Sequence, residues 1–550
     1  MKQISRLSSL IYGGILVVLS ITIFLSNGRL DNPILDVAII TSENNHEQNE
    51  SAEIESDDLD EVELSEQDQS LLQQALSYSK NGYLDQAINT YLEILSHNRN
   101  HQVASVNLAV LSLRKGDCNT AIHAIDHAVN VTRGTRLAKA LSMQGYCLLK
   151  QEKFNEAITA LTRSIEFRPS HSLTWKRLAE AQEKAKRDTQ DVLTSLIRAL
   201  ALDPKNNTLR ISVAEFQHEH LDFRGSINTL KEKYSRIKSI FKAQHLLAWN
   251  YLELEKWNNA QKHIKLASNL DKSKMKVLTA MELYSNQKYV DSIKHIKSNT
   301  KLNSQYRYLL ALNFKARNWK KTANKYFSRV KKSATLRLKS DLHLLQIKQN
   351  EMDHIQLSEG YQTLIQAGAL PNYPSYLIAR ILNKDKQYSL SHFWLKDLVY
   401  PNPIQSINNL YAHVLWKLNK QKDAIAILTD VIEQKPSHQR SLRQYSRYLM
   451  GTQSPKSALK HLTKIPFSEF RASDFILLSE IHQALQEHEK AERVLQEGLD
   501  YWSQDTDLRI EYAQILKQNS KHEKSRYQLA LVLKLDNNHP QAKQYLAEYQ

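Results

Sequence analysis

Two cysteines and a short histidine cluster are the residues in this sequence best suited to chemistry. Cys118 and Cys147 are the only thiols, too few for a four-cysteine zinc site, and they form no Cys-x-x-Cys pair. In an oxidising compartment they can form a disulfide; otherwise they serve as two small buried apolar residues. His218, Glu219 and His220 resemble a metal cluster. Residues two apart on a helix point to different faces, however, so we expect an ordinary solvated surface there.

Motifs that mark common catalytic and nucleotide-binding sites are absent from the sequence. The 12 glycines form no Gly-x-x-x-x-Gly-Lys-Ser/Thr loop, no Gly-x-Gly-x-x-Gly fingerprint and no Gly-x-Ser-x-Gly elbow. We therefore predict that the protein is not an enzyme. The sequence indicates no catalytic residue, no cofactor and no metal site.

A basic block between residues 286 and 348 is the strongest candidate for a binding surface. It contains sixteen Lys or Arg and only two acids, Asp291 and Asp341. Three interpretations remain open: a solvated face without a ligand, a docking surface for an acidic protein, anionic polysaccharide or lipid head groups, and contact with the chain's own acidic segment. Nucleic acid would also suit the charge, but the topology predicted below makes it an unlikely partner.

The stretch KKTANKYFSRVKK, residues 320–332, lies within this block. Ala323, Phe327 and Val330 have the spacing of the buried stripe of an amphipathic helix, so the basic residues between them must point away from the core. Two further basic residues end the preceding helix, nearer the edge of any groove. The candidate binding residues are Lys315, Arg317, Lys320, Lys321, Lys325, Arg329, Lys331 and Lys332.

The elements that carry these residues follow a repeated pattern. Ala87, Ala121 and Ala157 recur 34 and 36 residues apart. Each is followed four residues later by a large apolar residue and preceded twelve residues earlier by a small one. The large residues are Tyr91, Ile125 and Leu161, and the small ones are Ala75, Ala109 and Gly145. A small side chain lets two helix axes approach, and a large one fills the neighbouring gap.

This pattern resembles the tetratricopeptide repeat (TPR) family, whose unit is a helix–turn–helix of 34 residues. About thirteen units fit between residues 68 and 550, and those between about 272 and 405 are degenerate. The resemblance implies an all-α, right-handed α-solenoid whose concave groove binds peptides or partner proteins. It implies no chemistry. We expect a TPR array over residues 68–333, degenerate repeats over 334–405, and a second array with a C-terminal capping helix over 406–550.

The N-terminus has the composition of a membrane anchor. Residues 7–25 contain no charge, and at ~1.5 Å per residue a helix of this length crosses a ~30 Å hydrocarbon layer. A cleaved signal peptide is the alternative. Lys2 and Arg6 precede the span, so residues 1–6 should stay in the cytoplasm and the body should cross the membrane. We expect a single-pass inner-membrane protein with its repeats in the periplasm.

An acidic segment separates the predicted anchor from the repeats. Residues 31–69 carry fourteen acids and neither Lys nor Arg, whereas the whole chain has a net charge of +16. Such a composition does not bury enough apolar surface to fold, so we expect a disordered tether over residues 26–67. The sequence as a whole predicts a membrane-anchored scaffold that assists assembly or export of a bacterial surface complex. The alternative is a module that binds anionic polysaccharide through the basic block.

Overall fold

The computed structural model describes residues 65–232, 237–298, 303–398 and 405–549. The chain divides into two compact units, residues 1–115 and 116–550. The described residues contain 29 α-helices and no strand, which confirms the predicted all-α class. The predicted anchor at residues 7–25 lies outside the described residues, as does nearly all of the acidic tether. No helix in the described ranges is both long and apolar enough to cross a membrane.

The first unit contributes three described helices. They are α2 (Glu66–Lys80), α3 (Leu84–His97) and α4 (Gln102–Arg114). Ser65 caps α2, because its hydroxyl accepts a hydrogen bond from the amide of Asp68 at 3.1 Å. The helix therefore begins at Glu66, two residues before the predicted start of the repeats.

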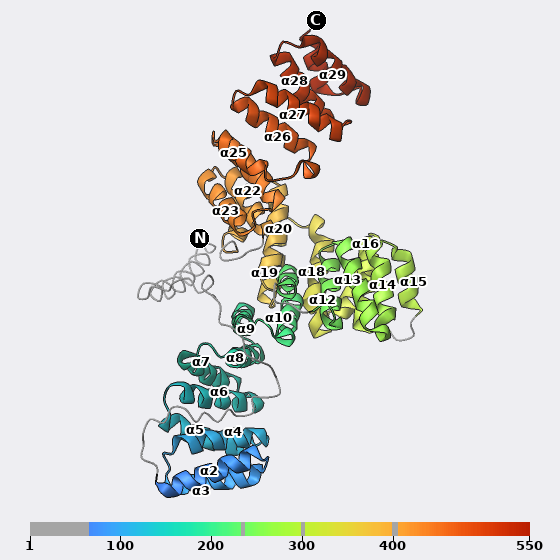
Figure 1. The fold of residues 1–550 in the computed structure, drawn as a ribbon. Helices are drawn as coiled ribbons and strands as arrows, with labels where there is room; N and C mark the ends of the chain where they lie inside the picture. The colour runs from blue at the N-terminus through green and yellow to red at the C-terminus, as the bar shows by residue number, and fades with distance from the viewer. Residues whose placement is uncertain (1–64, 233–236, 299–302, 399–404, 550) are drawn as a thin grey trace, which may run out of the picture. The chain divides into compact units, whose positions relative to one another are not determined.

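The second unit holds the other helices (Figure 1). Its first part contains α5 (Cys118–Val131), α6 (Gly134–Lys150), α7 (Phe154–Phe167), α8 (Ser172–Lys184) and α9 (Thr189–Leu202). The central array contains α10 (Asn207–Glu219), α11 (Phe223–Lys231), α12 (Phe241–Glu253), α13 (Trp257–Leu270), α14 (Met275–Ser285), α15 (Tyr289–Lys297), α16 (Ser304–Ala316) and α17 (Lys320–Val330).

Thirteen helices follow the central array. Four of them occupy the region where the sequence pattern is weakest: α18 (Arg337–Lys348), α19 (His354–Gln366), α20 (Asn372–Lys384) and α21 (Tyr388–Leu395). The C-terminal array contains α22 (Gln405–Lys417), α23 (Gln421–Gln434), α24 (Gln439–Gly451), α25 (Pro455–Leu462), α26 (Ala472–Ala484), α27 (His488–Tyr501), α28 (Thr506–Gln518) and α29 (His522–Leu535). The last helix is α30 (Pro540–Ala547).

A recurrent turn joins the two helices of most pairs. The second residue after the first helix adopts a positive φ, for example Glu152 at 60° between α6 and α7 and Ser520 at 61° between α28 and α29. This left-handed residue ends the first helix and reverses the chain within a few residues. The pair α18/α19 departs from the rule. A short 3₁₀ turn follows α18 instead, and Asp353 caps α19 through the amides of Ile355 and Gln356.

Small and large residues pack as the sequence predicts. Ala157 and Leu161 on α7 are fully buried. A Cβ atom added to Gly145 on α6 would lie 2.4 Å from Cγ of Leu161. Only a glycine leaves room for that leucine, so Gly145 sets the distance between α6 and α7.

Several degenerate pairs replace the small alanine with serine. Ser226, Ser292, Ser391 and Ser525 take the place that Ala157 holds in α7. Each hydroxyl donates to the carbonyl of the small residue twelve positions earlier, at 2.7–3.0 Å; the acceptors are Ala214, Ala280, Ala379 and Ala513. Serine is nearly as small as alanine and adds a hydrogen bond across the pair. The unit geometry thus persists where the alanine signature is lost.

The first helices of successive pairs form a common inner face. Helices α22, α24, α26 and α28 contact one another in order, whereas contacts between successive second helices are sparser. The side with the closer spacing is the inside of a curved stack. The same arrangement holds for α6 with α8, for α10 with α12, and for α14 with α16.

Helix α18 closes the inner face of the central array. It follows α17 in sequence, yet it packs beside α10 and α12 (Figure 1). Leu338 and Leu342 belong to the same apolar cluster as Leu221 and Phe223, more than 110 residues earlier. Residues 334–370 lie in the stretch for which the sequence predicts degenerate repeats, 334–405, without clear unit boundaries. In the structure this region contacts helices that lie more than 100 residues earlier in the chain.

The segment between α19 and α20 makes a second long-range contact. The amide of Leu370 donates to the carbonyl of His220 at 2.8 Å, and the hydroxyl of Thr189 donates to the carbonyl of Gly368 at 3.2 Å. Leu370 is fully buried among side chains of α8 to α10. This segment therefore fixes α9 and α10 relative to the helices that follow it.

Candidate functional site

The basic stretch 320–332 forms helix α17 with its charges outward. Ala323, Phe327 and Val330 are buried, as their spacing predicts. The lysines and arginines of the stretch are exposed. Two of them pair with acids, Lys320 with Glu351 at 3.9 Å and Lys331 with Asp341 at 3.0 Å. The other four make no ion pair with a described residue: Lys321, Lys325, Arg329 and Lys332.

The two candidate residues before this stretch have different environments. Arg317 is exposed, and its guanidinium stacks over the indole of Trp319, 4.3 Å from the ring centre. Lys315 instead points into the protein, where its ammonium contacts Gln346 and lies 2.9 Å from Nδ1 of His343. Burial lowers the pKa of Lys315 to about 8. The structure thus separates Lys315 from the other candidate residues.

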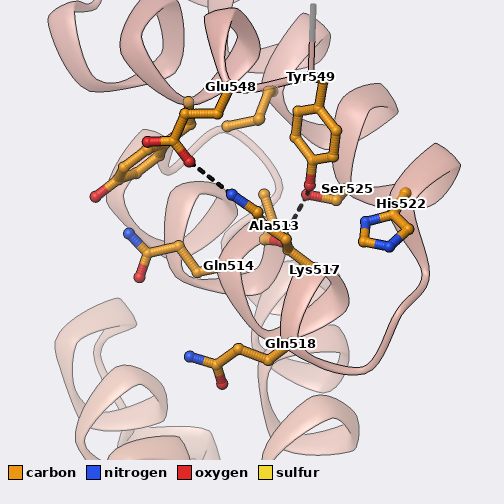
Figure 2. Close-up of a pocket in the computed structure, with 10 residues that line it drawn as sticks. Ala513, Gln514, Lys517, Gln518, His522, Ser525, Glu548 and Tyr549 are labelled. Carbon is orange, nitrogen blue, oxygen red and sulfur yellow. Dashed lines mark hydrogen bonds and ion pairs between the residues drawn. The ribbon is translucent and has the colours of Figure 1, made fainter.

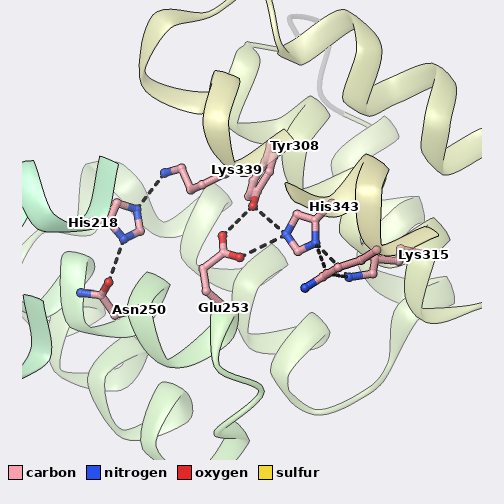
Figure 3. Close-up of polar contacts among 8 residues, drawn as sticks. His218, Asn250, Glu253, Tyr308, Lys315, Lys339 and His343 are labelled. Carbon is pink, nitrogen blue, oxygen red and sulfur yellow. Dashed lines mark hydrogen bonds and ion pairs between the residues drawn. The ribbon is translucent and has the colours of Figure 1, made fainter. Parts of the chain in front are cut away.

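Lys315 belongs to a buried polar network at the junction of α10, α12, α16 and α18 (Figure 3). Its centre is the carboxylate of Glu253, which is 9% exposed. One carboxylate oxygen accepts from the hydroxyl of Tyr308 at 2.6 Å, and the other lies 3.2 Å from Nε2 of His343. Since Nδ1 of His343 accepts from Lys315, Nε2 carries the proton and donates to Glu253.

The second arm of the network joins Lys339 to α10. Its ammonium lies 2.8 Å from Nε2 of His218, while Nδ1 of His218 lies 2.8 Å from Oδ1 of Asn250 (Figure 3). The ammonium of Lys339 can only donate, and the amide oxygen of Asn250 can only accept. Nδ1 of His218 therefore carries the proton, and Nε2 of His218 accepts. His218 is therefore a neutral imidazole that receives a hydrogen bond from a buried ammonium.

Burial and neighbouring charge set the protonation of this network. Burial alone would raise the pKa of Glu253, but the hydrogen bond from His343, with Lys339 and Tyr308, holds it at about 2. Burial, together with the charge of Lys339, lowers the pKa of His218 to about 3. Burial also lowers the pKa of Lys339 to about 8. At neutral pH the network thus holds one carboxylate, two ammonium groups and two neutral imidazoles.

The sequence pattern did not predict this network. Lys339 is one of the sixteen basic residues of the block that the sequence indicates as a candidate binding surface, yet its side chain is only 5% exposed. The sequence does hold one indication of burial. Lys339 and His343 lie four residues apart on one helix, and each directly follows a leucine of the apolar stripe, Leu338 and Leu342. Polar residues within an apolar stripe indicate buried hydrogen bonds. The partners, up to 121 residues away, had no local signature.

The expectation of a solvated surface at residues 218–220 was wrong. His218 is buried in the network, and His220 is partly buried with Nδ1 against the carbonyl of Gly368. The reason is that α18 and the α19–α20 segment cover this end of α10, which local periodicity does not reveal. Over the described ranges, no group of three or more His, Cys, Asp or Glu side chains has the arrangement of a metal site.

The two cysteines are free thiols in the structure. Cys118 begins α5 and is partly exposed, whereas Cys147 on α6 is buried. Burial and the neighbouring Cys118 raise the pKa of the Cys147 thiol. This protonated thiol is a poor nucleophile, as expected for a packing residue.

A hollow of about 430 Å³ lies at the end of the C-terminal array (Figure 2). Helices α28, α29 and α30 line it. Lys517 pairs with Glu548 across it at 2.6 Å, and the hydroxyl of Tyr549 lies 2.7 Å from Oγ of Ser525. These bonds fasten the last turn of the chain to the final pair, as a capping element requires.

The inner face of the C-terminal array carries acidic groups. Glu480 on α26 and Glu511 on α28 have pKa values raised by burial, and Glu480 raises that of Glu511 further. Arg447 on α24 offsets part of this charge near Glu480. Within the described part of the chain, no ion pair satisfies either glutamate. Two neighbouring carboxylates on the first helices α26 and α28 are thus without an ion pair among the described residues.

Comparisons with known proteins agree with the repeat geometry. A family model described as Tetratricopeptide repeat matches residues 138–171, which cover most of α6 and all of α7. No curated protein matches the chain. The paired helices, their left-handed turns and this match define a helical repeat protein. Residues 138–171 thus match a tetratricopeptide repeat, as the sequence pattern predicted for that unit.

Solved structures with partial similarity include the APC/C hetero-tetramer Cut9–Hcn1, at 12% identity over 88% of this chain and 96% of that chain, with a TM-score of 0.39. Yeast Tom70 is 12% identical over 75% of this chain and 94% of that chain, with a TM-score of 0.34. A MamA protein is 16% identical over 33% and 93%, with a TM-score of 0.29. Because every score is below 0.5, these likenesses carry no argument about function.

Proposed function

We propose that this protein is a non-catalytic scaffold that binds partner proteins along the inner face of its repeats. The observation that carries this proposal is the continuous inner face formed by first helices in contact, most clearly in the C-terminal array. Stacked helical repeats expose long concave surfaces of this kind, and such surfaces suit extended or helical segments of other proteins. The fold alone does not identify the partner, so the class of partner must be inferred from the side chains on the inner face.

The inner face of α22 to α28 is the best candidate for partner binding. In the central array α18 covers the corresponding face, whereas Glu480 and Glu511 remain without an ion pair among described residues. Their raised pKa values reflect carboxylates that lose hydration, which the charge of Arg447 offsets only in part at Glu480. A partner segment that brings Lys or Arg to this face would restore the missing charge partner.

We propose that the scaffold acts at a membrane. The uncharged run at residues 7–25, the preceding basic residues and the acidic segment after it support an inner-membrane anchor with the repeats in the periplasm. On this proposal the scaffold holds components of a bacterial surface complex during assembly or export. The acidic segment would let the repeats reach partners at a distance from the membrane.

Site-specific photocrosslinking tests the scaffold proposal. A photoreactive amino acid at Glu480, on the inner face, should give a discrete adduct in cells of the source organism. The same probe at Gln496, exposed on the second helix α27, is the matched control. Changing Glu511 to Lys should weaken the adduct at Glu480. Identical adducts at both positions, or none at Glu480, would contradict binding on the inner face.

Binding of anionic polysaccharide through the basic block is the second candidate function. The observation that favours it is the exposure of four cations without described ion partners on and just after α17. Exposed charges of this kind attract polyanions in a salt-dependent way. Lys315 is excluded from this surface, since its ammonium is turned into the protein.

Retention on immobilised alginate tests the second candidate. We expect retention at ~50 mM NaCl that disappears by ~300 mM, because screening shortens the range of the exposed charges. Serine substitution of Lys321, Lys325, Arg329 and Lys332 should abolish it. A matched variant with serine at the exposed Lys422, Lys456, Lys460 and Lys464 removes the same charge elsewhere. Equal losses in the two variants would indicate non-specific attraction by net charge.

A further inference from the structure

A cavity lies beside the buried network, where α18 closes the central array. It has a volume of about 230 Å³ and is lined by residues of α10, α12, α16, the 3₁₀ turn at Ala334–Leu336 and the first turn of α18. Leu246 and Trp249 supply an apolar wall. The indole of Trp249 donates to Nε2 of His245 at 3.1 Å, which holds its ring in place. Small-molecule sites combine such an apolar wall with a few convergent polar groups.

One pole of the cavity is the ammonium of Lys339, in a side chain that is 5% exposed. It has three N–H donors. The neutral imidazole of His218 accepts one at 2.8 Å, and the ring of Tyr308 lies 5.9 Å away. No other described side chain bonds to this ammonium. A buried ammonium with donors to spare is an anchor for an anionic oxygen.

A second charged group that lines the cavity is the carboxylate of Glu219. Burial raises the pKa of Glu219, and the charge of Lys339 lowers it, so the two groups interact electrostatically. They do not form an ion pair with each other, and Glu219 makes no side-chain bond to another described residue. The remaining charges at the cavity neutralise each other, because Lys242 pairs with Glu215 at 2.8 Å. The lining of the cavity thus includes one cation and one anion that form no ion pair with each other.

We propose that this cavity binds a free α-amino acid. The carboxylate of the ligand would accept from Lys339, its ammonium would donate to Glu219, and its side chain would lie against Leu246 and Trp249. A simple anion would meet the carboxylate of Glu219, and a simple cation would meet the ammonium of Lys339. A small zwitterion is the ligand class that satisfies both poles at once.

Thermal unfolding of the full chain, followed by calorimetric titration, tests this site. Each of the twenty amino acids is added at ~10 mM, beside acetate and ethylammonium at the same concentration. We expect at least one amino acid to raise the unfolding temperature, and neither single-charge probe to do so. No shift with any amino acid would overturn the proposal. An equal shift with acetate would replace it with a simple anion site.

Two variants locate the bound amino acid. Glu219 makes no side-chain hydrogen bond or ion pair with a described residue, so Glu219→Gln should fold normally and weaken binding by about tenfold or more. Glu282→Gln, on the exposed face of α14 in the same array, is the matched control and should bind as the natural chain does. A Glu219→Gln protein with unchanged affinity would place the ligand elsewhere and refute the site. A dipeptide that binds as well as the free amino acid would also contradict the proposal.

Discussion

Glu253 shows how single residues hold the central array together. Its carboxylate is buried, but it receives hydrogen bonds from Tyr308 and His343 and lies among the charges of Lys315 and Lys339. Ionic groups out of water cost free energy unless each has a partner. The network therefore adds little net stability as a whole, while loss of one member leaves the others uncompensated. It specifies which helices meet, α12 with α16 and α18.

Removal of the central charge should destabilise the array strongly. In Glu253→Gln the amide oxygen still accepts from Tyr308, but two buried ammonium groups lose their anion. We expect the free energy of unfolding in urea to fall by ~3 kcal/mol. Glu282→Gln, which is exposed on α14, is the control and should lie within ~0.5 kcal/mol of the natural protein. A Glu253→Gln midpoint equal to that of the control would show that the network is dispensable.

Acidification should weaken the same junction. Burial makes the folded pKa of His218 about 3, below the usual 6.5, so folding favours the neutral ring. The stability from that ring is present above pH 6.5 and is lost as the pH falls toward 3. Glu253 acts in the same direction at lower pH, since its folded pKa of about 2 lies below the usual 4.5.

Urea midpoints between pH 7 and pH 4 measure this dependence. Each group that must gain a proton on unfolding contributes up to ~1.4 kcal/mol per pH unit. His218→Gln keeps a polar side chain without a titrating ring, so the slope below pH 6.5 should decrease. His97→Gln, on the exposed face of α3, should leave it unchanged. An unaltered slope in His218→Gln would mean that other groups cause the acid sensitivity.

At the scale of helices, small residues set the distance between the two helices of each pair. Gly145 leaves room for Leu161, and the serine and alanine positions of later pairs do the same across α10/α11 and α20/α21. Helices at such close spacing bury their facing stripes completely. The alanine signature predicted most pairs, and it missed those in which serine supplies both small size and a hydrogen bond.

Gly145→Ala tests the close spacing of α6 and α7. The added methyl group would lie 2.4 Å from Leu161, so the helices or the leucine must move. We expect a loss of ~1–3 kcal/mol in urea unfolding, typical of overpacking. Combination with Leu161→Ala should cost less than the sum of the two changes, because the cavity accepts the methyl group. Additive losses would show that Gly145 does not act through Leu161.

Long-range closure organises the second unit at the scale of the molecule. Helix α18 covers the inner face of the central array, and the segment around Leu370 binds the end of α10. A plain stack of repeats contacts only its neighbours. Here two contacts link residues more than 100 positions apart, so parts of the unit should unfold together rather than one pair at a time.

Leu370→Ala should loosen this closure. The side chain is fully buried among α8 to α10, and its truncation leaves a cavity worth ~2–5 kcal/mol. We expect faster hydrogen exchange at both contact partners, residues 367–371 and the end of α10. Leu390→Ala, on an exposed side chain of α21, provides the control. Exchange that rises only at the mutated segment would argue against coupling to α10.

The sequence by itself determined the all-α class, the paired helices and the buried stripe of α17. These depend on local spacing: Ala323, Phe327 and Val330 share a face wherever the helix lies, and a small residue admits its neighbour within one pair. The fates of Lys315, Lys339 and His218 were decided only by the tertiary structure. Whether a helical lysine meets water or a buried imidazole depends on which distant helix covers it. Small rotations between successive pairs accumulate over many repeats. No short window of sequence therefore encodes which distant helices come into contact.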